Sequence, residues 1–217
     1  MCALVRECFL MGVGKTTLIH KASEVLKSSG VPVDGFYTEE VRQGGRRIGF
    51  DVVTLSGTRG PLSRVGLEPP PGKRECRVGQ YVVDLTSFER LALPVLRNGQ
   101  RVCIIDEIGK MELFSQPFIQ AVRQTLSTPG TIILGTIPVP KGKPLALVEE
   151  IRNRKDVKVF NSPYCGIEDQ SKFSSCVSQS TRTEPGWRQK LLQSLLNSEA
   201  PVVPTSVLPP FYLRWIP

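Results

Sequence analysis

A glycine-rich segment near the N-terminus has the residue types of a phosphate-binding loop: Gly12, Val13, Gly14, Lys15, Thr16 and Thr17. An apolar stretch precedes it and an amphipathic stretch follows it, so it falls where a strand ends and a helix begins. At such a junction the backbone N–H groups of the turn and of the helix N-terminus bind phosphate oxygens. Lys15 would then contact the β- and γ-phosphates as a catalytic cation, and the Thr16 hydroxyl would bind Mg²⁺. These six residues are therefore predicted to bind nucleotide.

The segment lacks part of the full phosphate-loop pattern G-x-x-x-x-G-K-[ST]. Counting back from Gly14, the first glycine of the pattern falls on Phe9, and a bulky residue does not suit the tight turn that this glycine makes. Arg6 and Glu7 also interrupt the preceding apolar stretch, although a central strand is buried on both faces. We therefore expect the strand to begin after Glu7, or this end of the chain not to fold as the pattern requires. On its own, the segment is equally compatible with an ordinary helix start.

A second motif, at 103–110, has the pattern of a Walker B strand, in which an apolar run ends in acidic residues. Asp106 would emerge at the carboxyl edge of a sheet, where open α/β sheets bind ligands, and would hold Mg²⁺ together with Thr16. Glu107 would orient the attacking water or accept its proton, so it is the second predicted catalytic residue. Two solvated acids at a strand end are the alternative interpretation. The residues of this motif predicted to bind nucleotide are Cys103, Ile104, Ile105, Asp106, Glu107, Ile108, Gly109 and Lys110.

The elements that would position these motifs alternate between strand and helix. Buried β-branched runs separated by amphipathic helices indicate a parallel sheet covered by helices. Strands are expected at 31–38, 102–105, 131–137 and 157–160, and helices at 16–27, 84–96, 114–126 and 145–152. A hairpin is expected at 40–53, turning at Gly44-Gly45. Residues 56–80 hold five glycines and four prolines and are predicted to form a loop.

The composition is that of a folded protein with a different C-terminal segment. Of 217 residues, 28 are Lys or Arg and 20 are Asp or Glu, which gives a formal net charge of +8. With 40% hydrophobic residues, the chain as a whole is not disordered. We expect a P-loop domain at 1–161, followed by a Pro- and Ser-rich tail at 162–217. The tail is predicted to be mostly unstructured, with one short helix at 185–196.

The charge and hydropathy patterns also limit the partners and the location. No apolar run reaches the about 18 residues of a membrane span, and the N-terminus has no secretory signal, so we expect a cytoplasmic protein without a membrane partner. Basic charge is scattered and the aromatic residues show no stacking pattern, so nucleic acid is not an expected partner. The expected partners are nucleoside triphosphates, bound by a monomer.

Taken together, the motifs resemble those of the small P-loop nucleoside-triphosphatase family. The segments that carry the resemblance are 13–21, 33–42, 49–53 and, most specifically, the Asp-Glu-Ile-Gly-Lys-Met-Glu run within 105–113. The resemblance covers roughly residues 12–161. It implies an α/β, RecA-like or kinase-like three-layer sandwich with a mainly parallel central sheet. It also implies Mg²⁺-dependent hydrolysis of nucleoside triphosphates, ATP and GTP among them, to diphosphates and phosphate.

The sequence departs from the family pattern at both ends. Phe9-Leu10-Met11 stands where the family has Gly-Pro-Pro, and the similarity stops beyond Asn161, before the family's terminal helix. The connection at 97–100 also looks shorter than in similar proteins. These departures predict a variant of the family with altered N- and C-terminal segments.

Two other functions fit a P-loop fold. A nucleoside or nucleotide kinase needs an acceptor pocket and an arginine-rich lid. The candidate lid residues are Arg42, Arg46, Arg47, Arg152 and Arg154. An inactive nucleotide-binding isoform would fit the altered first turn of the loop. Hydrolysis is favoured, because a kinase must keep water away from the γ-phosphate, whereas Glu107 stands beside the predicted Mg²⁺ as a base.

Overall fold

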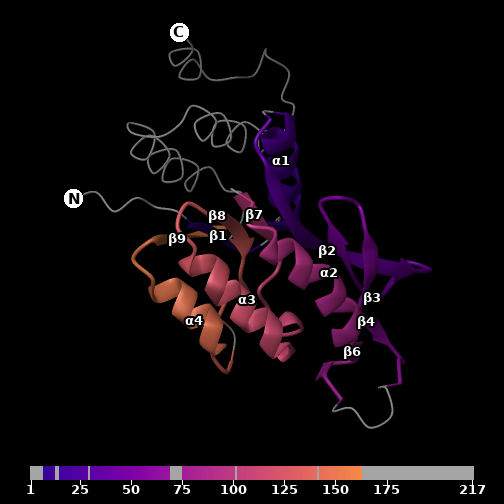
Figure 1. Cartoon of the computed structure of the whole chain (residues 1–217). Helices are drawn as coiled ribbons and strands as arrows, with labels where there is room; N and C mark the ends of the chain where they lie inside the picture. The colour runs from indigo at the N-terminus through magenta and orange to yellow at the C-terminus, as the bar shows by residue number, and fades with distance from the viewer. Residues whose placement is uncertain are drawn as a thin grey trace, which may run out of the picture.

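A computed structural model describes residues 7–12, 15–28, 30–68, 75–100, 102–140 and 142–162 of the chain. These residues form a three-layer α/β sandwich around one sheet of nine strands, in the order β5-β6-β4-β3-β2-β7-β8-β1-β9. Helix α1 lies on one face of the sheet, and α2, α3 and α4 lie on the other (Figure 1). The fold class expected from the sequence is therefore confirmed.

One half of the sheet is parallel and holds the two predicted motifs. Its strands are β2 (Val33–Gln43), β7 (Val102–Ile105), β8 (Ile132–Thr136), β1 (Glu7–Gly12) and β9 (Val157–Ser162). The strands predicted at 102–105, 131–137 and 157–160 are confirmed. Of the two alternatives for this end of the chain, a strand that begins after Glu7 was wrong by one residue, because the backbone of Glu7 already pairs with both neighbouring strands.

Strand β8 lies between β1 and β7. The strand that leads into the glycine-rich segment and the strand that ends in Asp106 are therefore second neighbours, about 10 Å apart at the usual strand spacing. All three run in the same direction, so their carboxyl ends meet at one edge of the sheet. This edge is where the sequence places its phosphate-binding and acidic residues.

The alternating side chains of β7 divide the interior into two cores. Val102 and Ile104 pack with residues of α1 (Lys15–Ser28), whereas Cys103 and Ile105 pack with the core beneath the other three helices. Because both faces are covered, every residue of β7 is buried, as a continuous apolar run predicts. The strand is thus held from both sides up to the residue before Asp106.

The helices on the second face begin at polar caps. Helix α2 (Leu85–Arg97) is capped by Asp84, whose carboxylate accepts the Ser87 N–H at 2.9 Å. Helix α3 (Gln116–Ser127) begins two residues later than predicted, because Ser115 caps it and a short 3₁₀ turn, Glu112–Phe114, precedes it. Helix α4 (Ala146–Asn153) lies as predicted at 145–152, within one residue at each end.

The other half of the sheet is antiparallel, and here the prediction of a loop at 56–80 was wrong. Strands β4 (Arg59–Val65), β5 (Arg77–Val78) and β6 (Tyr81–Val83) extend the sheet beyond β3 (Arg46–Thr54). The register shifts beside Pro61, so the proline stands at a bulge, where a missing N–H is tolerated. Gly60 allows a close approach to α2, because an added Cβ would lie 2.7 Å from Ser87 Oγ and 2.8 Å from Leu91 Cδ1 and would force these side chains to shift.

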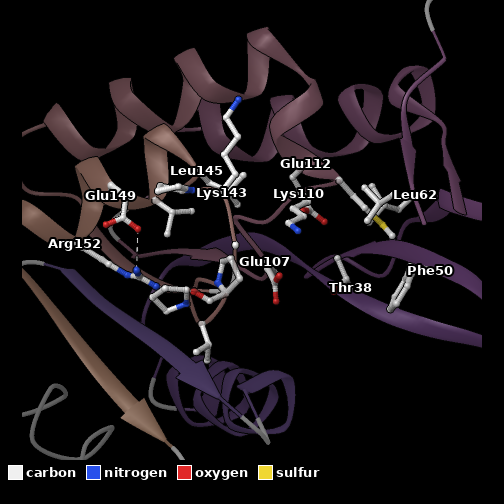
Figure 2. A pocket seen from close by; sticks show the side chains of 18 residues that line it. Thr38, Phe50, Leu62, Glu107, Lys110, Glu112, Lys143, Leu145, Glu149 and Arg152 are labelled. Carbon is white, nitrogen blue, oxygen red and sulfur yellow. Dashed lines mark hydrogen bonds and ion pairs between the residues drawn. The ribbon is translucent and has the colours of Figure 1, made fainter. Parts of the chain in front are cut away.

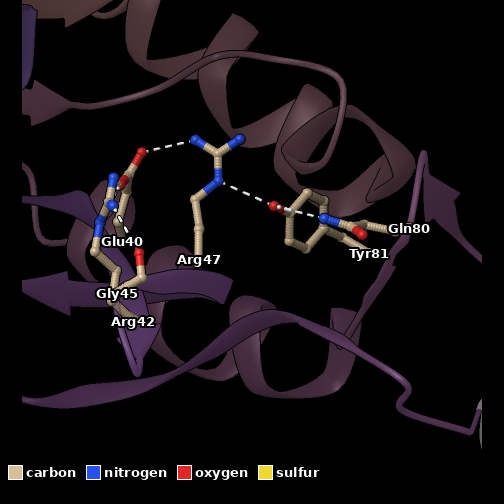
Figure 3. Close-up of polar contacts among 6 residues, drawn as sticks. All are labelled: Glu40, Arg42, Gly45, Arg47, Gln80 and Tyr81. Atoms are coloured by element: carbon tan, nitrogen blue, oxygen red, sulfur yellow. Dashed lines mark hydrogen bonds and ion pairs between the residues drawn. The ribbon is translucent and has the colours of Figure 1, made fainter.

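The β2–β3 hairpin turns at Gly44-Gly45 as predicted, and both glycines have positive φ, at 55° and 77°. Arg47 on β3 links its neighbour β2 to β6, which lies beyond β4: its Nη1 lies 2.7 Å from Glu40 Oε1, and its Nε donates to the Tyr81 hydroxyl at 2.9 Å (Figure 3). Arg42 also pairs with Glu40. Arg47 therefore holds strands together, whereas Arg42 makes its contacts within β2 and with the Gly45 carbonyl of the turn.

The predicted tail, including its helix at 185–196, lies outside the described residues apart from Ser162. None of the helices in the described part of the chain combines the length and the apolar character that crossing a membrane requires.

Candidate active site

The carboxylate of Asp106 joins three elements at the carboxyl edge of the sheet. It follows β7 directly, and only 1% of Asp106 is exposed. The Thr16 hydroxyl, from the first turn of α1, donates to its Oδ2 at 2.8 Å. The hydroxyl of Thr136, the last residue of β8, donates to its Oδ1. The structure thus brings together the two predicted Mg²⁺ ligands, which are 90 residues apart in the sequence.

Backbone bonds hold the segment after β7 on both sides. The Asp106 N–H donates to the Phe36 carbonyl of β2 at 3.1 Å, and the Ile108 N–H donates to the Thr136 carbonyl of β8 at 2.9 Å. The backbone of β2 comes so close to β7 at Gly35 that an added Cβ would lie 2.0 Å from the Ile104 carbonyl oxygen. Asp106 is therefore positioned by the sheet itself.

The chemistry of this donor set fits a magnesium ion. Mg²⁺ prefers carboxylate and hydroxyl oxygens, and it usually binds one or two protein carboxylates together with substrate phosphates. Thr16 and Asp106 supply such oxygens within hydrogen-bonding distance of each other, at the end of α1 that faces the edge. Thr136 contributes a third hydroxyl. Thr136 is fully buried, and its hydroxyl group is directed at Asp106.

Glu107 lies beside a cavity of about 580 Å³ at the same edge. Figure 2 shows Glu107, Lys110 and Glu112, all from the segment after β7, facing this cavity. Apolar side chains of β3 and β4, Phe50 and Leu62, form part of its wall. Residues 138–140 and 142–145, helix α4, Thr38 of β2, Val78 of β5 and Met111 complete the lining. The predicted water-activating carboxylate therefore faces a space that is large enough for a small molecule.

A second carboxylate at this cavity, Glu112, was not assigned a role from the sequence. It is 4% exposed, and its Oε2 accepts the N–H of Gly109 at 3.1 Å. Burial, and next the negative charge of Glu107, raise the pKa of Glu112 from 4.5 to about 8. Glu112 is part of the motif that carries the family resemblance, but its burial depends on packing that no local pattern reveals.

The other predicted site residues fall into three groups. Gly12 ends β1, and Lys15 and Thr17 lie in the first turn of α1, whereas Val13 and Gly14 lie outside the described residues. The side chains of the predicted site residues on β7, which are Cys103, Ile104 and Ile105, pack in the two cores. Beyond the strand, Ile108 and Gly109 are buried and Lys110 is exposed.

The two candidate arginines at the end of α4 have different surroundings. Arg152 lines the cavity, with a side chain 15% exposed, and its guanidinium contacts Glu149 Oε1 at 2.9 Å and the Pro138 carbonyl at 2.8 Å. Arg154 instead donates to the Leu126 carbonyl and pairs with Asp156. Of the two, Arg152 faces the cavity, and Arg154 ties α3 to the turn before β9.

Residues 10–165 match the family model described as NTPase. The match includes the phosphate-binding segment, the acidic motif and every helix and strand from α1 to β9.

Two relatives illustrate the range of similarity. The "Cancer-related nucleoside-triphosphatase" of Homo sapiens is 89% identical over 168 residues, which cover 73% of this chain and 88% of the human chain. The "Nucleoside-triphosphatase THEP1" of Thermotoga sp. (strain RQ2) is 42% identical over 152 residues, which cover 69% of this chain and 80% of that chain. A solved structure, the solution structure of a human cancer-related nucleoside triphosphatase, matches with a TM-score of 0.67 at 79% identity and covers 82% of this chain and all of that chain.

Proposed function

The chain belongs to the NTPase family and is a nucleoside-triphosphatase, and we propose that it hydrolyses ATP and GTP, with Mg²⁺, at the edge that holds Thr16, Asp106 and Glu107. The resemblance inferred from the motifs is thereby confirmed. The observation that carries the proposed site is the 2.8 Å contact between Thr16 and Asp106, because it joins the start of α1 to the end of β7. This is the contact that a phosphate loop and an acidic strand need in order to share one metal ion.

In the proposed reaction, separate groups bind the phosphates, activate the water and hold the metal ion. The backbone at the start of α1 and Lys15 bind the β- and γ-phosphates. Glu107 accepts a proton from the water whose oxygen attacks the γ-phosphorus, while the bond to the β–γ bridging oxygen breaks and the diphosphate leaves. Thr16 and Asp106 would hold Mg²⁺, which would neutralise charge on the phosphate oxygens. The enclosed position of Asp106 supports this role, because a carboxylate removed from water attracts a cation more strongly.

The test is phosphate release from ATP and GTP by the full chain with Mg²⁺. We expect Lys15→Ala and Glu107→Gln each to lower kcat by about 100-fold or more. Matched controls on exposed residues, Lys155→Ala and Glu150→Gln, should stay within about twofold, and EDTA should abolish release. Circular-dichroism melts establish that each variant is folded.

Two outcomes would contradict parts of this proposal. Full turnover by a folded Glu107→Gln protein would remove Glu107 from the reaction. Phosphate appearing on an added nucleoside, with little free phosphate, would identify a kinase instead.

A further inference from the structure

Two glutamates converge on one glycine in the segment after β7. A Cβ added at Gly109 would lie 2.5 Å from Glu107 Oε1 and 3.1 Å from Glu112 Oε2. The Gly109 N–H also donates to that same Oε2 at 3.1 Å. Both carboxyl groups therefore lie against the position that a Cβ of Gly109 would occupy, and both side chains line the same cavity.

The two carboxyl groups differ in their contact with water. Glu112 is almost completely enclosed, whereas Glu107 is half-buried at the cavity wall. A buried carboxyl group next to another carboxylate retains its proton, and the more exposed partner carries the charge. The pKa of about 8 for Glu112 agrees with this division.

Glu112 shares the cavity with four other charged groups. Lys110 comes from its own segment, Lys143 from the loop before α4, and Glu149 and Arg152 from α4. Arg152 is engaged by Glu149 and the Pro138 carbonyl, and Lys110 is exposed. Asp106 adds a smaller repulsion that also favours the neutral form of Glu112. Burial and the nearby acids therefore decide the state of Glu112.

We propose that Glu112 is a positioning residue for Glu107: its carboxyl group accepts the Gly109 N–H and so holds the 107–109 turn with Glu107 facing the cavity. The inference rests on the proposed role of Glu107 in activating water. Its effect on the reaction is exerted through Glu107. When it ionises at alkaline pH, it repels Glu107 beside Gly109, and the turn no longer presents Glu107 in the same position.

The experiment compares phosphate release by wild type, Glu112→Gln and Glu112→Ala between pH 6 and pH 10. Wild type should lose kcat as the pH rises past about 8. Glu112→Gln, a neutral isostere, should keep kcat within threefold at pH 7 and should not show that loss. Glu112→Ala lacks the acceptor for Gly109 and should lose at least tenfold in kcat, with less than a threefold change in KM. Glu150→Gln serves as the exposed control.

A second variant perturbs the 107–109 turn without altering Glu112. Gly109→Ala adds a methyl group against Glu107 Oε1, so it should lower kcat at least tenfold while the Kd for Mg²⁺-ATP stays within threefold. Unchanged kcat in Glu112→Ala, or an alkaline loss in Glu112→Gln equal to that of wild type, would overturn the positioning role. Glu107→Gln separates the two hypotheses. If that variant is inactive while the Glu112 variants behave as wild type, only the present inference fails; if it is fully active, the proposed function fails first.

Discussion

Replacing Glu112 by glutamine should change how the stability of the protein depends on pH. Burial raises the pKa of Glu112 in the folded chain from 4.5 to about 8, whereas in the unfolded chain the group titrates near 4.5. Between these values the folded state binds more protons than the unfolded state, so the stability of the wild type falls as the pH rises through this window. Glutamine does not titrate, and the variant escapes this loss.

The size of the effect follows from the same two values. A difference of one pKa unit corresponds to about 1.4 kcal/mol, so the wild type loses about 3 kcal/mol from this group between pH 4 and pH 7 and about 5 kcal/mol by pH 9. Such a loss is a large part of the about 5–15 kcal/mol that stabilises a typical domain. The free energy of unfolding of Glu112→Gln minus that of wild type should therefore increase by about 3 kcal/mol between pH 4 and pH 7 and by about 5 kcal/mol between pH 4 and pH 9.

The assay is urea unfolding followed by circular dichroism at pH 5, 7 and 9. Other titrating groups are common to both proteins and cancel in the difference. Glu24→Gln, at an exposed position on α1, is the control and should show no such trend. A difference between Glu112→Gln and wild type that stays constant within about 1 kcal/mol from pH 5 to pH 9 would refute the reasoning, since it would mean that Glu112 is ionised in the folded protein at neutral pH.

Three further substitutions test the framework of the site. Thr136→Val removes a hydroxyl donor from the buried Asp106 carboxylate and should cost about 1–3 kcal/mol of stability, measured by urea unfolding, and weaken Mg²⁺-dependent turnover. Gly35→Ala places a Cβ 2.0 Å from the Ile104 carbonyl oxygen at a φ of 139°, so it should cost at least about 3 kcal/mol or prevent folding, as seen by circular dichroism. Phe118→Ala empties the centre of the larger core and should cost about 3–5 kcal/mol in the same assay.

Each of these substitutions has a milder counterpart. Thr136→Ser keeps the hydroxyl and should retain Mg²⁺-dependent turnover. Gly30→Ala, also at positive φ but with no atom within 4 Å, should cost only about 1–2 kcal/mol. Phe118→Leu should cost less than Phe118→Ala, because it leaves a smaller cavity. Equal losses for the members of any pair would contradict the contact on which that prediction depends.

The parallel half of the fold was predictable because each of its elements carries a local signal. Val102–Ile105 is a continuous apolar run, and a continuous apolar run indicates a strand buried on both faces. Asp84 and the Gly44-Gly45 pair mark a helix start and a hairpin turn by their residue types alone. The pairing of Thr16 with Asp106 could be predicted as well, because both lie at carboxyl ends of parallel strands or directly after them.

What could not be predicted depends on contacts between distant segments. The residue types of Gly60 and Pro61 predict a loop. In the structure, Gly60 allows β4 to approach α2 closely, and Pro61 lies beside a bulge in β4. Glu112 reads as a solvated acid, and only the packing of the 3₁₀ turn beneath the cavity makes it a buried one. In both cases tertiary structure overrides the preference of the residue type.

The position of β1 in the sheet has a consequence for how the chain folds during synthesis. β1 is the first strand, yet its two neighbours, β8 and β9, are the last two strands of the described sheet. The β2–β3 hairpin and β4 pair with neighbours in the sequence, so the antiparallel half can form as soon as it leaves the ribosome. β1 must wait until residue 162 has been made before both of its edges are paired. The segment that leads into the phosphate-binding loop is therefore synthesised before the other described strands and is among the last to be held in place.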